Sequence, residues 1–247
     1  HVLPHAKALS QIHFPDDAGL ANQARHCLAF EELFIYQLGA YEQRKIWEET
    51  MKSYPIHIDK TDVQRFIQSL PFTLTNDQLH TTEEILADLT RPYPMNRLLE
   101  GDVGSGKTVV AAIAMYCAFR NGLSSILMAP TQILAEQHFQ TISGLLDPFD
   151  IQIRLVTGSS VKQIPDSRRS LPRTAIRGSN TKGDDADILV GTHALLFDKI
   201  KLNRLGLVVI DEQQRFGVDQ RAKLIKTSST GKTAHFLTMT ATPIPRT

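Results

Sequence analysis

Cysteine is scarce in this chain of 247 residues, which contains only Cys27 and Cys117. Two cysteines make no disulfide framework, so we expect two reduced, buried thiols, as in cytoplasmic proteins. The sequence also lacks any run of about eighteen or more apolar residues and does not open with a signal-peptide pattern. These absences exclude a disulfide-stapled secreted module and a membrane span, and they predict a cytoplasmic location.

An excess of charge of one sign is also lacking. The sequence has 27 Lys and Arg against 26 Asp and Glu, a formal net charge of +1. A charge so near zero gives no global attraction to nucleic acid, so any such site must be a local patch. The nine histidines are scattered without metal-ligand spacing, so we predict no metal beyond a Mg²⁺ ion that accompanies a nucleotide.

Residues 1–70 contain no pattern with catalytic spacing and are predicted to form an α-helical linker segment. No proline occurs between Asn22 and Ser53, and we expect an amphipathic packing helix there, with a break near Gly39 as the alternative. The apolar residues that recur at helical spacing are Phe30, Leu33, Phe34, Leu38 and Tyr41.

From residue 71 onward, short apolar runs alternate with helix-like stretches. This alternation predicts an α/β domain over residues 71–247, with a mainly parallel sheet flanked by helices. Ligands of such sheets bind at the carboxyl ends of the strands. The strand candidates are residues 98–99, 126–128, 151–156, 188–190, 207–210 and 236–237.

Residues 101–108 read Gly-Asp-Val-Gly-Ser-Gly-Lys-Thr and match G-x-x-x-x-G-K-[ST] at every fixed position. The glycines let the backbone curl until several N–H groups point at one phosphate cluster. Lys107 adds a point charge for the β- and γ-phosphates, and Thr108 offers a hydroxyl to Mg²⁺. A strand candidate before the motif and an apolar helix candidate after it disfavour the alternative of a plain glycine-rich turn. The nucleotide-binding candidates here are Gly101, Gly104, Ser105, Gly106, Lys107 and Thr108.

A second candidate for chemistry is the pair Asp211 and Glu212, which ends an apolar strand candidate. Asp211 would hold Mg²⁺ through its water shell, and Glu212 would orient and activate the water that attacks the γ-phosphate. Alone, such a pair is more often a helix N-cap. Combined with the phosphate loop, it favours hydrolysis, and Lys107, Asp211 and Glu212 are the predicted catalytic residues.

Gln78 has two interpretations. With Thr75 it forms the pattern of a capping box at the start of a helix. The same side-chain amide could instead read adenine, by accepting from the exocyclic amine and donating to a ring nitrogen. Spacing alone favours the cap.

Two further segments have open interpretations. Thr240 and Thr242 follow a strand candidate, and their hydroxyls could bridge the acidic pair to a moving part, although a Ser/Thr turn is the simpler interpretation. Residues 159–186 are rich in Gly, Pro, Ser and Asn. We expect a mobile surface loop there, and a loop that contacts nucleic acid is the alternative.

Several motifs in order resemble the superfamily 2 helicases, and specifically the bacterial RecG family of ATP-dependent DNA helicases. The phosphate loop is shared with many unrelated NTPases. The more specific segments are Gly-Thr-His-Ala-Leu at 191–195, Arg-Phe-Gly-Val at 215–218 and Thr-Ala-Thr-Pro-Ile-Pro-Arg-Thr at 240–247. They narrow the resemblance to RecG and the transcription-repair coupling factor. The remaining segments are residues 72–78, 129–138 and, for RecG in particular, 3–4, 12–15 and 28–34.

The resemblance implies a first RecA-like motor domain that binds ATP and Mg²⁺ and remodels branched double-stranded DNA, such as stalled forks and Holliday junctions. By position, it implies that Phe72 and Gln78 face adenine and that Thr131 and Thr192 meet the DNA backbone. It also implies that hydrolysis is coupled to movement by Gln214, where the family commonly has His, and by Thr240 and Thr242.

Further domains are implied as partners. A RecG-type motor needs a second RecA-like domain, which supplies arginines to the nucleotide site, and a wedge domain that binds the fork. Neither is recognisable in this sequence, so we expect a monomer that binds ATP with little turnover on its own. The alternative is a non-translocating P-loop ATPase that serves as a regulatory module, and a small-molecule kinase is disfavoured because no lid-like arginine cluster is present.

Overall fold

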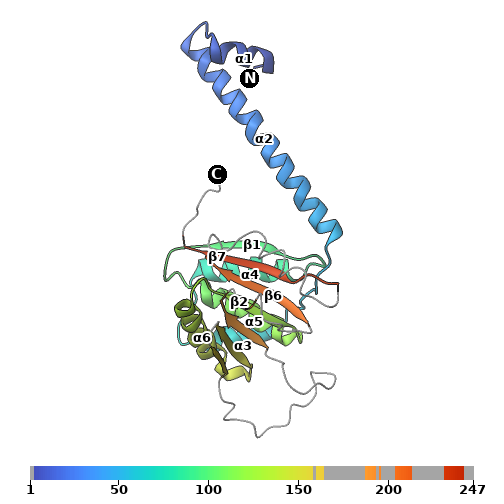
Figure 1. Cartoon of the computed structure of the whole chain (residues 1–247), viewed down its shortest axis with the longest axis vertical. Coiled ribbons are helices and arrows are strands. Elements are labelled where there is room, and N and C mark those ends of the chain that lie inside the picture. Colours follow the sequence, from blue (N-terminus) through green and yellow to red (C-terminus); the bar gives the residue numbers. More distant parts are fainter. Residues whose placement is uncertain are drawn as a thin grey trace. The chain divides into compact units, whose positions relative to one another are not determined.

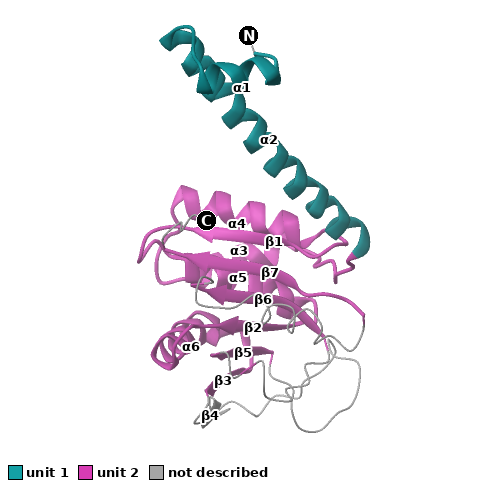
Figure 2. Cartoon of the chain, turned by 45° about the horizontal axis from the view of Figure 1, so that its top comes forward, with its two compact units in different colours: residues 1–50 teal, residues 51–247 magenta. Residues whose placement is uncertain are grey.

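The computed structural model describes residues 3–157, 160–163, 187–192, 195, 204–212 and 231–241. The chain divides into two compact units, residues 1–50 and 51–247 (Figure 2). None of the helices in the described part is both long and apolar enough to cross a membrane. In chain order the elements are α1 (His5–His13), α2 (Ala18–Thr50), α3 (Lys60–Ser69), α4 (Asn76–Leu89), β1 (Asn96–Glu100), α5 (Lys107–Arg120), β2 (Ser124–Met128), α6 (Gln132–Leu146), η1 (Asp147–Phe149), β3 (Ile153–Thr157), β4 (Ser160–Gln163), β5 (Ile188–Gly191), β6 (Leu205–Asp211) and β7 (His235–Thr240).

The first unit is a pair of helices. Helix α1 packs against the start of α2 through a small buried cluster of Ala8, Ala24 and Cys27. The Asp17 carboxylate accepts a hydrogen bond from the Leu20 N–H at 2.8 Å, which satisfies one of the donors that a helix start leaves unpaired. Helix α2 runs for 33 residues without interruption, so the alternative of a break near Gly39 is wrong.

The apolar stripe of α2 is exposed. The helical spacing predicted the helix correctly, but the side chains that were expected to pack lie 55–63% exposed. The buried residues of α2, Ala24 and Cys27, lie in its first turns. The exposed members of the stripe are Phe30, Leu33, Phe34, Leu38 and Tyr41.

The second unit is built on a seven-stranded sheet with the order β1-β7-β6-β2-β5-β3-β4 (Figure 1). Every neighbouring pair is parallel except β3 and β4, which are antiparallel. The sheet, mainly parallel and flanked by helices, confirms the predicted α/β class. Each strand candidate overlaps an observed strand. Helix α5 crosses from β1 to β2 and α6 from β2 toward β3, and parallel strands need crossover connections of this kind.

Both faces of the central strands β7, β6, β2 and β5 are buried. Successive side chains of a strand point to opposite faces, and in β6 Leu207 and Val209 join the cluster beneath α3 to α6, whereas Val208 and Ile210 join a second cluster. Helix α5 is buried along Val109–Ala118. A helix that is apolar all round belongs inside a protein, which explains the apolar run that follows the phosphate loop.

Residues 51–70 pack with the second unit. Phe66 of α3 is fully buried, its ring 5.5 Å from that of Phe149 and 5.2 Å from that of Tyr116. The division of the chain therefore falls after Thr50, earlier than the boundary at residue 70 that the sequence pattern suggested. The change of pattern at residue 71 marks where strands begin to alternate with helices, and α3 precedes it while belonging to the same core.

The segment that was expected to be a mobile loop contains a strand at its start. Residues 160–163 form β4, which pairs antiparallel with β3. Residues 164–186 lie outside the described residues, so the expectations of mobility and of nucleic-acid contact there stay predictions. Gln214 and Thr242 also lie outside the described residues.

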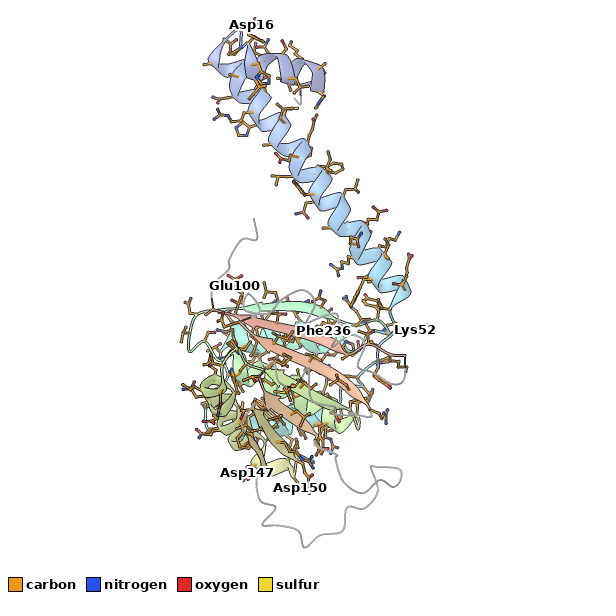
Figure 3. All side chains as sticks on the ribbon, in the orientation of Figure 1. Asp16, Lys52, Glu100, Asp147, Asp150 and Phe236 are labelled. Carbon is orange, nitrogen blue, oxygen red and sulfur yellow. The ribbon has the colours of Figure 1, made fainter. Side chains whose placement is uncertain are left out.

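Buried His235, at the start of β7, ties residues 51–58 to the sheet. Its Nδ1 accepts from the Met95 N–H at 3.0 Å, and its Nε2 donates to the Tyr54 carbonyl at 2.9 Å. A ring that accepts at one nitrogen and donates at the other is neutral. Consistently, burial lowers the pKa of His235 below its ordinary value. Lys52 and Phe236, labelled in Figure 3, belong to the same region: the Lys52 carbonyl accepts from Thr233 and the Phe236 N–H donates to Met95.

We predict that the free energy of unfolding falls as the pH drops below the ordinary histidine pKa of 6.5. In the unfolded chain the ring titrates near that value, and in the folded chain it titrates lower. Between the folded and unfolded pKa values of His235, the unfolded state therefore binds more protons. The contribution of the neutral His235 to the free energy of unfolding is complete above pH 6.5 and is lost as the pH falls toward the folded pKa. His235→Gln should flatten the dependence in urea titrations between about pH 7 and pH 5, whereas exposed His80→Gln should not. An unchanged slope in His235→Gln would contradict the assignment.

Candidate nucleotide site and metal site

The predicted site residues gather at the carboxyl edge of the sheet. The phosphate loop follows β1, and the register places Glu100 opposite Thr240, the last residue of β7. The Gly101 N–H also donates to the Thr240 carbonyl at 3.3 Å. Strand β6 ends at Asp211, opposite Met239. Glu100, labelled in Figure 3, marks this edge. Segments more than a hundred residues apart in the chain therefore meet at neighbouring strand ends.

The phosphate loop has the backbone that its glycines predict. Gly104 and Gly106 have φ angles of 82° and 84°, a region in which residues with a Cβ are strained. Gly106 is the N-cap of α5, so the loop leads directly into a helix start, where backbone donors and the helix dipole favour anions. The Lys107 ammonium donates to the carbonyls of Gly101 at 2.6 Å and Asp102 at 2.9 Å. An ammonium has three donors, so a third remains for a phosphate oxygen.

Gln78 forms the predicted capping box. Its Oε1 accepts from the Thr75 N–H at 2.9 Å, and its own N–H donates to Thr75 Oγ1 at 3.2 Å. Its Nε2 also donates to the Ser105 carbonyl at 2.8 Å. The sequence pattern did not predict this last bond, which joins α4 to the phosphate loop across 27 positions. The approach is so close that a Cβ added to Gly106 would lie 2.3 Å from Gln78 Nε2. Contact of Gln78 with adenine stays a prediction, as does that of Phe72, which is 48% exposed.

Glu212 is joined to the end of β7. Its Oε2 accepts from Thr240 Oγ1 at 3.4 Å, and its Oε1 accepts from the Ala241 N–H at 3.1 Å. Its own N–H donates to the Met239 carbonyl at 2.9 Å. Glu212 has a φ of 50°, which is uncommon for a residue with a side chain and occurs where surrounding contacts hold it. Thr240 is therefore hydrogen-bonded to the acidic pair through Glu212, and its role in coupling hydrolysis to movement stays a prediction.

Asp211 has a different partner. His138 of α6 places Nε2 2.8 Å from Asp211 Oδ2, and each side chain is 13% exposed. No sequence pattern assigned His138 a role. It lies at the end of the segment 129–138 that carried part of the family resemblance, but that segment does not indicate a partner 73 positions away.

The two threonines predicted to meet DNA follow neighbouring strands, β2 and β5. Thr131 is the exposed N-cap of α6, and its Oγ1 accepts from the Leu134 N–H at 3.3 Å. Thr192 is 7% exposed. The Ala129 N–H donates to the Gly191 carbonyl at 2.8 Å, which holds the two strand ends together. Of the two, Thr131 is the more accessible to a DNA backbone.

The oxygen ligands available at this edge suit a magnesium ion that is coordinated mainly by phosphates and water. Within the described residues, no group of three or more His, Cys, Asp and Glu side chains could hold a metal ion. Mg²⁺ usually keeps several waters and takes one or two protein ligands beside substrate phosphates. The Thr108 hydroxyl and the Asp211 carboxylate are oxygen donors of that kind and could hold it.

Comparison with known proteins agrees with this arrangement. Residues 75–247 match the family model of the DEAD/DEAH box helicases. The chain belongs to this family. It is 44% identical to the ATP-dependent DNA helicase RecG of Bacillus subtilis over 98% of this chain and 34% of that protein. It is 43% identical to RecG of Synechocystis over 97% of this chain and 27% of that protein. The resemblance to RecG proteins is thereby confirmed.

Solved structures give the same result. The structure of RecG bound to a three-way DNA junction has a TM-score of 0.75 and 38% identity, and the match covers 97% of this chain and 30% of that one. S. cerevisiae Dbp5 bound to RNA and ADP BeF3 matches with a TM-score of 0.53 at 17% identity, which supports the fold alone. The chain spans about a third or less of the length of the RecG proteins of Bacillus subtilis and Synechocystis.

We predict that Gln78→Glu weakens the preference for ATP over GTP without loosening the start of α4. The glutamate keeps the carboxyl oxygen that accepts from Thr75, but it loses the amide N–H groups that can donate to a base or to Ser105. Isothermal calorimetry with both nucleotides measures the preference. As the control, Thr75→Ala removes the cap bond and should cost about 1 kcal/mol of stability while leaving the preference unchanged. If Gln78→Glu prefers ATP as strongly as the wild type, Gln78 does not read adenine.

Proposed function

We propose that this chain is the ATP-binding motor domain of a DNA helicase or translocase that remodels branched DNA in recombination and repair. The bond between Glu212 and Thr240, at the edge where the phosphate loop also lies, carries the proposal. It joins the candidate for water activation to the end of a neighbouring strand. The similarity to a RecG structure bound to a three-way junction supports branched DNA as the partner. A non-translocating regulatory ATPase is not favoured, because the similarity to RecG extends over almost the whole chain.

In this proposal the phosphate loop binds ATP through its backbone N–H groups and through Lys107, and Phe72 and Gln78 face the adenine. Mg²⁺, when bound, neutralises charge on the β- and γ-phosphates. Thr108 and Asp211 hold the ion, Asp211 through water. Glu212 orients the attacking water and accepts its proton.

Coupling follows from the partners of Glu212. Because Thr240 and Ala241 both donate to its carboxylate, a change in the charge or position of Glu212 during hydrolysis alters the end of β7. We propose that Thr240, with Gln214 and Thr242, passes this change to DNA, and that Thr131 and Thr192 contact the DNA backbone. Phosphate contacts of this type carry no base specificity.

We propose that this motor belongs to a longer protein, since the RecG proteins that it matches are about three times as long. We also propose that this protein is monomeric and cytoplasmic. A second RecA-like domain would supply arginine to the γ-phosphate, and a wedge domain would bind the junction. Residues 1–50, the first of the two units, would serve as the linker that precedes the motor domain.

We predict that Lys107→Ala abolishes most nucleotide binding. The substitution removes the ammonium beside the phosphate loop, which supplies the point charge for the β- and γ-phosphates. Equilibrium dialysis with Mg²⁺-ATP measures the effect. Lys45→Ala, on the exposed part of α2, is the matched control for the loss of one positive charge and should bind as the wild type does. Wild-type affinity in Lys107→Ala would rule out this nucleotide site.

We predict that Glu212→Gln slows ATP hydrolysis by about a hundredfold or more while leaving ATP binding nearly unchanged, because an amide is a poor general base. The measurement uses a fusion of this chain to the second motor domain of a RecG protein, with branched DNA present. Without that domain, the missing arginine should leave turnover about a thousandfold or more lower. Glu100→Gln, an exposed carboxylate at the same sheet edge, should keep full activity. Equal rates in the isolated chain and the fusion would contradict the role given to the second domain.

A further inference from the structure

His138 lies on the buried face of α6, where the helical spacing of the buried residues predicts an apolar side chain. The buried residues of this helix are Ala135, Ile142 and Leu146. Positions separated by three or four residues share one face of a helix, so His138 lies on the same face between them. A polar side chain there is costly unless it is hydrogen-bonded, and its observed partner is Asp211 at 2.8 Å.

The geometry defines what the bond can do. An ionised carboxylate only accepts hydrogen bonds, so the proton lies on His138 Nε2. The bond fixes one oxygen of Asp211 and thereby the rotation of the carboxylate. The other oxygen is then directed by the same rotation and can accept from a water in a metal's shell. Partners of metal-binding groups orient them in this way in many metal sites.

We propose that His138 is the positioning residue of Asp211: it orients the carboxylate toward the water shell of nucleotide-bound Mg²⁺ and ties that shell to α6. The inference rests on the proposed function, since it assumes that Asp211 serves the metal.

The tie to α6 gives the bond a second consequence. Thr131, the N-cap of α6, is seven positions before His138, which is almost two helical turns or about 10 Å along the axis. Positions seven apart lie on one face, and α6 is held by its buried residues Ala135 and Ile142. A displacement of the exposed start of the helix is therefore carried to His138, and through it to Asp211. Binding of DNA at Thr131 thus changes the metal site.

A purely structural role would leave the metal unaffected. In that case the pair would only fasten α6 to β6, and its loss would lower the thermal stability without changing the affinity for a divalent ion. The two roles differ in metal affinity, which is measurable without turnover.

The test uses Mn²⁺ as the probe ion in electron paramagnetic resonance titrations of the chain with ADP. His138→Leu fits the apolar face of α6 and removes the donor, and it should weaken Mn²⁺ binding about tenfold or more. Binding of ADP in EDTA should be unchanged. His138→Gln retains a donor of similar reach and should restore most of the affinity, and the shorter His138→Asn should restore less. His80→Ala, which removes an exposed histidine paired with Glu84, is the matched control and should behave as the wild type does.

A second titration adds a short DNA duplex at low salt. The duplex should change the Mn²⁺ dissociation constant severalfold in the wild type and leave it unchanged in His138→Leu. Equal Mn²⁺ affinity in wild type and His138→Leu would overturn the positioning role, and an equal or absent effect of DNA in the two would overturn the tie to α6. If His138→Leu does not fold, the Mn²⁺ affinities of the wild type, His138→Gln and His138→Asn test the proposal instead. Equal Mn²⁺ affinities in these three proteins would overturn it. Failure of the wild type to bind Mn²⁺ with ADP would instead count against the proposed function itself.

Discussion

The parallel register of β1, β7, β6, β2 and β5 is the constraint on which the site depends. Each pairing sets one strand end against the next: Glu100 lies opposite Thr240, and Met128 lies opposite both Ile210 and Gly191. A slip of two residues in one pairing would move the following loop by about 7 Å, enough to break every hydrogen bond at this edge. In β7, β6, β2 and β5 both faces are buried in different clusters, so a slip of one residue would exchange the two faces of a strand and mismatch both clusters. In β1, Leu99 is buried and Leu98 is 56% exposed, so the same slip would expose the buried side chain.

Local patterns predicted the parts of the molecule that depend on neighbours in the sequence. The apolar runs marked the strands, and their alternation with helices gave the parallel sheet. The capping box was readable because Thr75 and Gln78 are three residues apart on one helix start. The phosphate loop was readable because its fixed positions, Gly101, Gly106, Lys107 and Thr108, lie within eight residues. Gly106 adopts the positive φ that favours glycine. In each case the physical cause acts within a few residues.

The bonds that the sequence did not predict join distant segments. Gln78 with Ser105, His138 with Asp211 and His235 with Met95 are separated by 27, 73 and 140 positions. Each depends on the order of the strands in the sheet, which no short-range period encodes. The apolar stripe on α2 also shows that a local pattern does not predict long-range contacts. Its spacing predicts a helix with an apolar face, but a period carries no information about what covers that face, and Phe34 and Tyr41 are exposed.

The two adjacent acids are separated by their partners. Asp211 bonds to α6 and Glu212 bonds to the end of β7, and the elements that hold them lie on opposite sides of β6, since β2, which leads into α6, and β7 are its two neighbours in the sheet. An extended strand would also send successive side chains to opposite sides of the sheet, but toward its two faces. The positive φ of Glu212 instead ends the strand and directs that carboxylate to β7 within the carboxyl edge. In the proposed roles, Asp211 holds the metal and Glu212 activates the water. The first is therefore positioned by α6 and the second by the end of β7. The motion of α6 reaches the first and the motion of β7 reaches the second, so the two sides of β6 can act on one nucleotide without being packed against each other.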